Sequence, residues 1–170
     1  NIVPIIEPEV LMDGDHAINK CYDVTSEVLK ECYEELYLHN VDLKGTILKP
    51  NMVLPGSSSQ IKSNSEEIAQ LTIKCLKQNV PSEVAGIAFL SGGQTEIEAT
   101  NNLNAINKMN NTNFVFTFSY GRALQQSALN YWGKNQEGSI NTQKIFNHRA
   151  KMNSLSTSGQ WTKDIDKIII

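Results

Sequence analysis

Four short apolar segments, each ending in polar or small residues, constrain the fold of this chain more than any other feature. They are IVPIIEPE at residues 2–9, GTILKPN at 45–51, GIAFLSGG at 86–93 and NFVFTFSYGR at 113–122. Each is apolar nearly throughout instead of alternating, which is typical of strands buried on both faces of a parallel sheet. The sequence therefore predicts four buried parallel strands.

The stretches between and after these segments have helical periodicity. Residues 17–38 place Ile18, Cys21 and Leu29 on one apolar face, with Lys and Glu opposite. Residues 65–78 begin with Ser65 as the expected N-cap and two glutamates that suit a helix N-terminus. Further helices are predicted at residues 95–108, from residue 122 and at 139–155. The alternating order predicts an α/β fold with right-handed crossovers.

The length, net charge and hydropathy of the chain limit the classes of protein to which it can belong. With 170 residues, the chain is long enough for one domain with a buried core. Its 15 basic and 18 acidic residues give a net charge of −3, which argues against a nucleic-acid partner. No apolar run approaches the roughly 18 residues of a membrane span. The chain opens at Asn1, without a methionine, inside an apolar run, so we expect it to be part of a longer protein.

The cysteines and histidines do not indicate a metal site. Cys21, Cys32 and Cys75 are odd in number and widely spaced, which predicts buried thiols in a reducing compartment. The three histidines are scattered along the chain and cannot be grouped with them by spacing.

Polar side chains follow each of the four predicted strands. In a parallel α/β fold, the carboxyl ends of the strands meet at one edge of the sheet, where active sites are built. We therefore expect residues far apart in the sequence to converge there. They are Glu7, Glu9, Lys49, Ser91, Gly92, Gly93, Ser119 and Arg122.

Lys49 ends an apolar segment and precedes Pro50, which favours an extended backbone at the lysine. One interpretation is a strand-end lysine paired with a carboxylate. The other is a nucleophile, because burial among apolar neighbours disfavours the ammonium and leaves free amine near neutral pH. Such an amine forms a Schiff base with a carbonyl substrate, and the protonated imine then accepts the electrons of a neighbouring carbanion.

Glu7 and Glu9 offer the proton shuttle that imine formation and hydrolysis require. Residues two apart on a strand point to the same side, so both carboxylates can face Lys49. Two like charges close together favour protonation of one of them, which suits a general acid/base. A solvated strand end is the alternative interpretation of an isolated ExE sequence.

Two glycine loops follow the last two strands. SGG at residues 91–93 precedes a helix that starts near Thr95, so its backbone N–H groups and the helix dipole favour an anion. SYGR at 119–122 repeats the pattern, because Gly121 allows close approach of the backbone and Arg122 can bind phosphate bidentately. SGG alone is a weak signal, whereas two such loops in succession predict a phosphate site, as in many TIM barrels.

Four motifs occur in the order and spacing of a known family. They are IVPIIEPEVLMDGDH (2–16), GTILKPNMVLPG (45–56), GIAFLSGGQTEIEATNNLNAIN (86–107) and FTFSYGRALQQSAL (116–129). Together they resemble the C-terminal half of class I fructose-1,6-bisphosphate aldolase, and the resemblance continues to NSL near residue 155. It implies a (βα)8 TIM barrel, of which residues 1–157 supply strands five to eight with their helices, followed by a C-terminal tail at 158–170.

The resemblance also implies roles for individual residues. Lys49 matches the Schiff-base lysine, and Glu7 matches the main acid/base glutamate. Glu9 matches the neighbouring carboxylate that tunes the lysine. The two glycine loops match the binding site of the substrate's C1 phosphate, at Ser91, Gly92, Gly93, Ser119, Gly121 and Arg122.

The implied reaction is the glycolytic, reversible cleavage of fructose 1,6-bisphosphate into dihydroxyacetone phosphate and glyceraldehyde 3-phosphate. It needs no metal or cofactor, because the iminium on Lys49 does the work of the zinc ion in the other aldolase class. The resemblance further implies a cytoplasmic homotetramer, with actin or adhesin tails as partners of some members.

Two departures from the family pattern lead us to expect impaired activity in this chain alone. Only four of eight strands are visible, and the family's N-terminal half supplies an Asp for carbon–carbon cleavage, further lysines and the ligands of the other phosphate. The family's tail ends in a Tyr, whereas this chain ends WTKDIDKIII, so the tail is expected to be altered or truncated. Two alternatives stay open: another Schiff-base barrel, such as a transaldolase-like enzyme, and a non-catalytic phosphate-binding scaffold derived from an aldolase.

Overall fold

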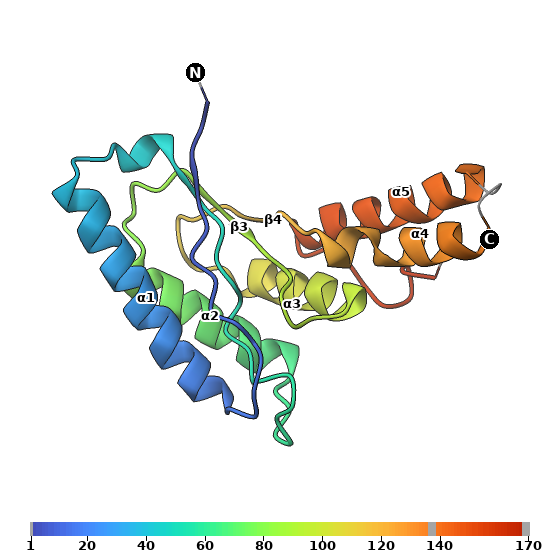
Figure 1. The fold of residues 1–170 in the computed structure, drawn as a ribbon, viewed down its shortest axis with the longest axis horizontal. Helices are drawn as coiled ribbons and strands as arrows, with labels where there is room; N and C mark the ends of the chain where they lie inside the picture. Colours follow the sequence, from blue (N-terminus) through green and yellow to red (C-terminus); the bar gives the residue numbers. More distant parts are fainter. Residues whose placement is uncertain (1, 136–138, 168–170) are drawn as a thin grey trace.

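The computed structural model describes residues 2–135 and 139–167 (Figure 1). Its four strands are all parallel and form one open sheet in chain order: β1 (Ile5–Ile6), β2 (Ile47–Leu48), β3 (Gly86–Phe89) and β4 (Phe116–Phe118). The helices are α1 (Ile18–Leu38), α2 (Ser65–Asn79), α3 (Glu96–Met109), α4 (Arg122–Lys134) and α5 (Ser139–Ser156). A short 3-10 helix, Leu43–Gly45, precedes β2. The predicted α/β class is confirmed.

The strands are much shorter than the apolar segments that predicted them. β1 and β2 pair over two residues each, Ile5 with Ile47 and Ile6 with Leu48. Pro4, Pro8 and Pro50 flank these pairs and have no backbone N–H to donate to a neighbouring strand. Apolar residues beyond the strand ends, such as Met52 and Val53, are still buried, but they pack in loops.

The prediction that the strands are buried on both faces is wrong for β1 and only partly correct for the rest. The hydrophobic core contains Leu48, Ile87, Phe89 and Phe116, which alternate along their strands and face the helices. The residues between them point to the other face, where none of the described helices packs. Ile5 there is 54% exposed, because β1 has no neighbouring strand on its outer side.

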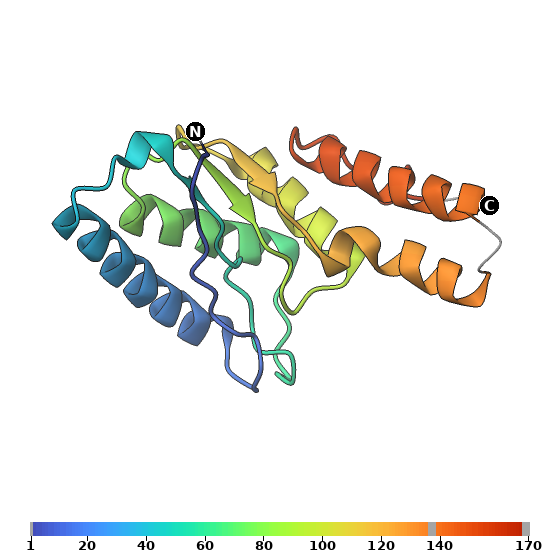
Figure 2. The ribbon, with the colours of Figure 1, turned by 45° about the horizontal axis from the view of Figure 1, so that its top comes forward.

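The helices pack as a row against the sheet. Figures 1 and 2 show α1, α2 and α3 side by side along one face, while α4 and α5 pair with each other beyond the β4 end. Contacts between α1 and α2, α2 and α3, and α3 and α5 join the row into one body. The carboxyl ends of the strands are thereby held at one edge of the sheet.

Side-chain caps explain where α2 and α3 begin. α2 was expected to be capped by Ser65, but the cap is Asn64, whose side chain accepts a hydrogen bond from the backbone N–H of Glu67 at 2.9 Å. Ser65 instead accepts one from Asn101 of α3 at 2.7 Å. α3 starts with a capping box, in which Thr95 and Glu98 satisfy each other's backbone N–H groups.

Candidate active site at the carboxyl ends of the strands

Lys49 lies at the end of β2 and contacts Glu7 at the end of β1. Its Nζ is 2.8 Å from Oε1 of Glu7, and its side chain is 20% exposed whereas that of Glu7 is 46% exposed. Alternation along β2 places Lys49 on the face opposite Leu48, away from the helices. The amine is therefore shielded, and the carboxylate next to it reaches solvent, as a proton shuttle requires.

Glu9 lies over the first glycine loop. Its Oε1 is 2.9 Å from the position that a Cβ on Gly92 would occupy. A side chain at residue 92 would therefore displace this carboxylate. Glu7 and Glu9 are brought to the same edge of the sheet, one beside Lys49 and the other beside residues 91–93.

The SGG loop forms a tight turn packed under the segment that follows β1. The backbone N–H of Gln94 donates to the carbonyl of Ser91 at 3.1 Å. Gly93 has a φ of +74°, and a Cβ there would lie 2.7 Å from Cβ of Met12, so glycine is required for both conformation and space. The capping box satisfies the N–H groups of Thr95 and Glu98 at the start of α3, so these two are not available to an anion.

The SYGR loop leaves its helix end open. α4 begins at Arg122, and Gly121 at the N-cap has no side chain with which to cap it. The first turn, residues 122–125, contains no acidic residue. Ser119, Gly121 and Arg122 are all exposed. A helix N-terminus with a free arginine is a favourable place for a phosphate.

Asn51 was given no role from the sequence, yet it is one of the most highly connected side chains near Lys49. It is 2% exposed. Its Oδ1 accepts the backbone N–H of Val10 at 3.1 Å, and its Nδ2 donates to Oγ1 of Thr25 and the carbonyl of Met52, both at 3.1 Å. A polar residue directly after Pro50 in an otherwise apolar segment was the only signal in the sequence.

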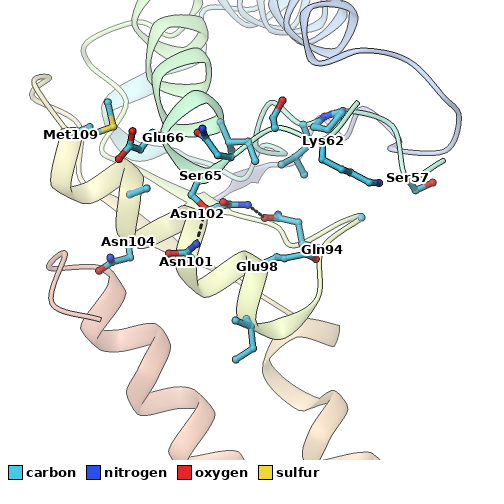
Figure 3. Close-up of a pocket in the computed structure, with 18 of the residues that line it drawn as sticks. Ser57, Lys62, Ser65, Glu66, Gln94, Glu98, Asn101, Asn102, Asn104 and Met109 are labelled. Atoms are coloured by element: carbon cyan, nitrogen blue, oxygen red, sulfur yellow. Dashed lines mark hydrogen bonds between the residues drawn. The ribbon is translucent and has the colours of Figure 1, made fainter. Parts of the chain in front are cut away.

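A large pocket lies elsewhere, between the start of α2 and α3 (Figure 3). It has a volume of about 1190 Å³ and is lined by polar side chains, among them Lys62, Ser65, Gln94 and Asn101. Of the predicted site residues, only Gly93 lines it. The pocket is thus separate from Lys49, which does not line it.

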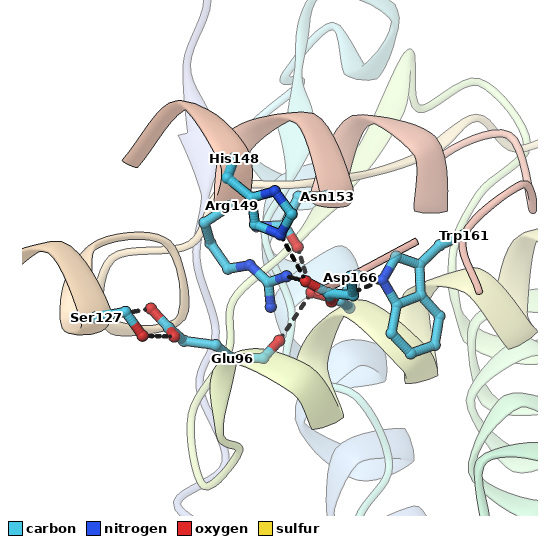
Figure 4. A network of polar contacts seen from close by, with 8 residues as sticks. Glu96, Ser127, His148, Arg149, Asn153, Trp161 and Asp166 are labelled. Carbon is cyan, nitrogen blue, oxygen red and sulfur yellow. Dashed lines mark hydrogen bonds and ion pairs between the residues drawn. The ribbon is translucent and has the colours of Figure 1, made fainter. Parts of the chain in front are cut away.

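The C-terminal tail is held against α5 by a buried cluster around Asp166 (Figure 4). Oδ1 of Asp166 contacts Arg149 and lies 3.0 Å from Nε2 of His148, and its Oδ2 accepts the indole N–H of Trp161 at 2.8 Å. The backbone N–H of Trp161 donates to Asn104 of α3 at 3.0 Å. The part of the tail up to residue 167 is therefore docked, and residues 168–170 lie outside the described residues.

A second contact in Figure 4 joins the start of α3 to the middle of α4. Glu96, the first residue of α3, accepts hydrogen bonds from the backbone N–H and the hydroxyl of Ser127 in α4. This contact links the two helices that follow the glycine loops.

Two negative findings apply to residues 2–135 and 139–167. No group of three His, Cys, Asp or Glu side chains in these ranges could hold a metal ion. None of the helices there is long and apolar enough to cross a membrane.

Comparisons with known proteins agree with the fold and the motif order. The family model for fructose-bisphosphate aldolase class-I matches residues 1–168. The chain is 52% identical to a cytosolic fructose-bisphosphate aldolase of Arabidopsis thaliana, over 96% of this chain and 42% of that protein. It is 46% identical to the fructose-bisphosphate aldolase of Dictyostelium discoideum, over 95% of this chain and 45% of that one.

A solved structure matches equally well. Fructose-bisphosphate aldolase from Plasmodium falciparum, in complex with TRAP and a small-molecule inhibitor, superposes with a TM-score of 0.91 at 43% identity. The match covers 95% of this chain and 46% of that one. The chain thus spans less than half the length of the relatives it matches.

Proposed function

Because this chain belongs to the class I fructose-bisphosphate aldolase family, we propose that it supplies the imine-forming half of an aldolase active site. The reaction is the reversible cleavage of fructose 1,6-bisphosphate into dihydroxyacetone phosphate and glyceraldehyde 3-phosphate. The contact that supports this proposal most directly is the 2.8 Å approach of Nζ of Lys49 to Oε1 of Glu7.

In the first step, the neutral amine of Lys49 attacks the C2 carbonyl carbon of the ketose. The resulting carbinolamine loses its hydroxyl group as water, and Glu7 donates the proton to that leaving oxygen. The product is a positively charged iminium between Lys49 and C2. Glu9 adds a second negative charge at the same edge and favours the cationic intermediate.

In the second step, the bond between C3 and C4 breaks and its electron pair passes to the iminium, which becomes a neutral enamine. The proton of the C4 hydroxyl leaves with this step, so that C4 becomes the aldehyde carbon. The resemblance assigns the base that takes this proton to the N-terminal half of the barrel. We therefore propose that full turnover requires the rest of the barrel, while imine formation requires the residues of this chain.

The substrate's C1 phosphate binds between the two glycine loops in this proposal. Arg122 and the open N-terminus of α4 supply the positive charge and the N–H donors on one side. The N–H groups of Gly92 and Gly93 and the hydroxyl groups of Ser91 and Ser119 complete the site. Electrostatic attraction of the dianion to Arg122 then places C2 near Lys49.

The test is to trap the imine. We expect incubation with dihydroxyacetone phosphate followed by borohydride to attach the reduced three-carbon phosphate to Lys49, as read by peptide mass spectrometry. Lys49→Met should carry no adduct, and Arg122→Ala should need roughly tenfold more dihydroxyacetone phosphate for half-maximal labelling. An adduct spread over exposed lysines, or none at all, would contradict the proposal.

A second candidate function is a non-catalytic, phosphate-binding scaffold. The exposed residues Ser119, Gly121 and Arg122 at the start of α4 favour it, because a phosphate can bind there without any chemistry following. Binding of dihydroxyacetone phosphate that depends on Arg122 but leaves Lys49 unmodified after borohydride would select this candidate. Cleavage products from fructose bisphosphate, in contrast, would exclude a transaldolase-like activity.

The proposed partners follow from the same family. They are a phosphorylated sugar, further copies of the chain in a homotetramer, and an adhesin tail. The similar Plasmodium falciparum aldolase was solved in complex with TRAP, which supports the last of these. The proposed location is the cytoplasm, where the Arabidopsis thaliana and Spinacia oleracea relatives are placed by their names.

A further inference from the structure

The pairing between β1 and β2 cannot continue into the active site. The last backbone bond of the ladder runs from the N–H of Lys49 to the carbonyl of Ile6, at 2.7 Å. The next residues in register would be Glu7 with Lys49 and Pro8 with Pro50. Neither proline has an N–H to donate. Lys49 is therefore the last residue of β2 that a main-chain hydrogen bond holds to β1, and Glu7 directly follows the residue that accepts this bond.

The side chain of Asn51 makes the next connection. Its Oδ1 accepts the backbone N–H of Val10 at 3.1 Å. The β1 side thus advances from residue 6 to residue 10 between the two connections, while the β2 side advances only from residue 49 to residue 51. The segment 7–9 must arch between them, and this arch presents Glu7 to Nζ of Lys49.

The side chain of Asn51 is itself held by a hydrogen bond to helix α1. Strand alternation would place residue 51 on the same face as Lys49, but its Nδ2 instead donates to Oγ1 of Thr25 in α1 and to the carbonyl of Met52. With all three hydrogen bonds made and 2% exposure, the amide has one orientation. A buried, fully satisfied polar group of this kind specifies a single arrangement of the segments it joins.

We propose that Asn51 is a positioning residue that clamps the 7–9 arch to β2 and to α1, and so holds Glu7 against Lys49. The inference rests on the proposed function in treating Lys49 as the imine-forming amine. The geometry it describes, however, can be measured without any substrate.

The first experiment measures how available the Lys49 amine is. Trace acetylation with acetic anhydride, read by peptide mass spectrometry, compares Lys49 with Lys30, whose side chain is 65% exposed. In Asn51→Ala, the arch is released and Glu7 leaves the amine, so the ratio of Lys49 to Lys30 acetylation should change by about threefold or more. An unchanged ratio would overturn the proposal.

Asn104→Ala is the matched control. Asn104 is also buried, and its Oδ1 also accepts a backbone N–H from a distant segment, that of Trp161 at 3.0 Å. Its removal should lower stability as Asn51→Ala does but leave the acetylation ratio unchanged. If both variants change the ratio alike, the effect is one of general loosening and the positioning role is refuted.

Thr25→Val covers the case in which Asn51→Ala does not fold. It keeps the shape of residue 25 and removes only the hydroxyl that orients the Asn51 amide. We expect a smaller change in the acetylation ratio in the same direction, and no change would count against the proposal.

Imine trapping with dihydroxyacetone phosphate separates this inference from the proposed function. Slower trapping in Asn51→Ala than in Asn104→Ala, with the wild type labelled at Lys49, supports both. A wild type that is never labelled, together with a changed acetylation ratio in Asn51→Ala, refutes the proposed function and leaves the positioning role supported.

Discussion

At the scale of single residues, the pair of Lys49 and Glu7 has the wrong properties for a stabilising ion pair. Glu7 is 46% exposed, and an ion pair with so much contact with water contributes at most about 1 kcal/mol to stability. Its partner is only 20% exposed, and a lysine in that position loses hydration and side-chain freedom. The arrangement makes more sense as a proton shuttle than as a structural contact.

If Glu7 is a proton shuttle, Glu7→Gln should strongly slow imine trapping but hardly change the stability of the fold. The amide cannot donate a proton to the leaving hydroxyl, so borohydride trapping with dihydroxyacetone phosphate should slow by about 100-fold. The free energy of unfolding in urea should change by less than about 1 kcal/mol. A large loss of stability with unimpaired trapping would show that Glu7 is structural.

The buried thiols predict how stability depends on pH. Burial raises the pKa of Cys21 and of Cys75 above the ordinary value of 9.0. In the unfolded chain these thiols ionise near 9.0, while in the folded chain they stay protonated, so the unfolded state binds fewer protons there. Stability from this source is complete below about pH 8 and falls as the pH rises through 9 and beyond.

Urea unfolding under reducing conditions, from about pH 7.5 to about pH 9.5, measures this slope. Each thiol contributes up to about 1.4 kcal/mol per pH unit. Cys75→Ala should reduce the slope, because one of the two groups is removed. An equal slope in the variant would mean that other groups, such as Tyr33 and Tyr120, whose pKa values burial also raises, dominate the decline.

At the scale of elements, the two glycine loops precede helices that start differently. α3 is closed by its own capping box, whereas α4 starts at an uncapped glycine followed by Arg122. The sequence presents the loops as equivalent, whereas in the structure the start of α3 is capped by side chains and the start of α4 is not. Glu96 at the start of α3 also accepts a hydrogen bond from Ser127 of α4, which links the two helices.

The cap of α2 provides a prediction at this scale. Asn64→Ala removes the acceptor for the N–H of Glu67 and should lower the free energy of unfolding by about 1 kcal/mol. Asn64→Asp keeps an acceptor at the same place and adds a favourable charge at the helix N-terminus, so it should be nearly neutral. Urea titration of both variants measures the difference, and equal losses would show that the cap is not what Asn64 contributes.

At the scale of the whole molecule, the sheet has two edge strands, each of which pairs on one side only within the described residues. β1 and β4 are edge strands, and Ile5 of β1 is exposed, as are Ile2 and Val3 in the segment before it. Such an edge favours pairing with further strands. The tail is held to the helices by the Asp166 cluster on the opposite side of the molecule from this edge.

The Asp166 cluster predicts that Asp166→Asn strongly lowers the stability of the protein. Asp166→Asn removes the charge that balances Arg149, whose side chain is 5% exposed, and leaves a buried cation without its partner. The free energy of unfolding should fall by about 3 kcal/mol or more, as measured by urea titration followed through Trp161 fluorescence.

Asp164→Asn is the control for this prediction. Asp164 pairs with Lys167 at 3.4 Å, but its side chain is 92% exposed, so stability should change by no more than about 0.5 kcal/mol. Similar losses in the two variants would mean that the tail is not fixed through the buried cluster.

The sequence by itself determined the order of strands and helices, the α/β class and the family. These depend on local periodicity and on motifs such as LKPNMV and FSYGRALQ, which each element carries within its own residues. The starts of all five helices, and the ends of the four for which an end was predicted, agree with the structure within one residue for the same reason. The strands were predicted too long, because the prolines that end the pairing do not interrupt the apolar pattern.

Only the tertiary structure decided which side chains meet. The sequence led us to expect Glu7 and Glu9 near Lys49, but only the structure shows that Glu7 makes the contact. The bond from Asn51 to Val10 and the docking of the tail through Asp166 likewise join residues that are distant in sequence. No periodicity encodes such pairs, since their geometry depends on where the strands stop and on what packs beneath them. The assignment of the nine site residues stays a prediction, and the buried amide of Asn51 could be found only once the fold was known.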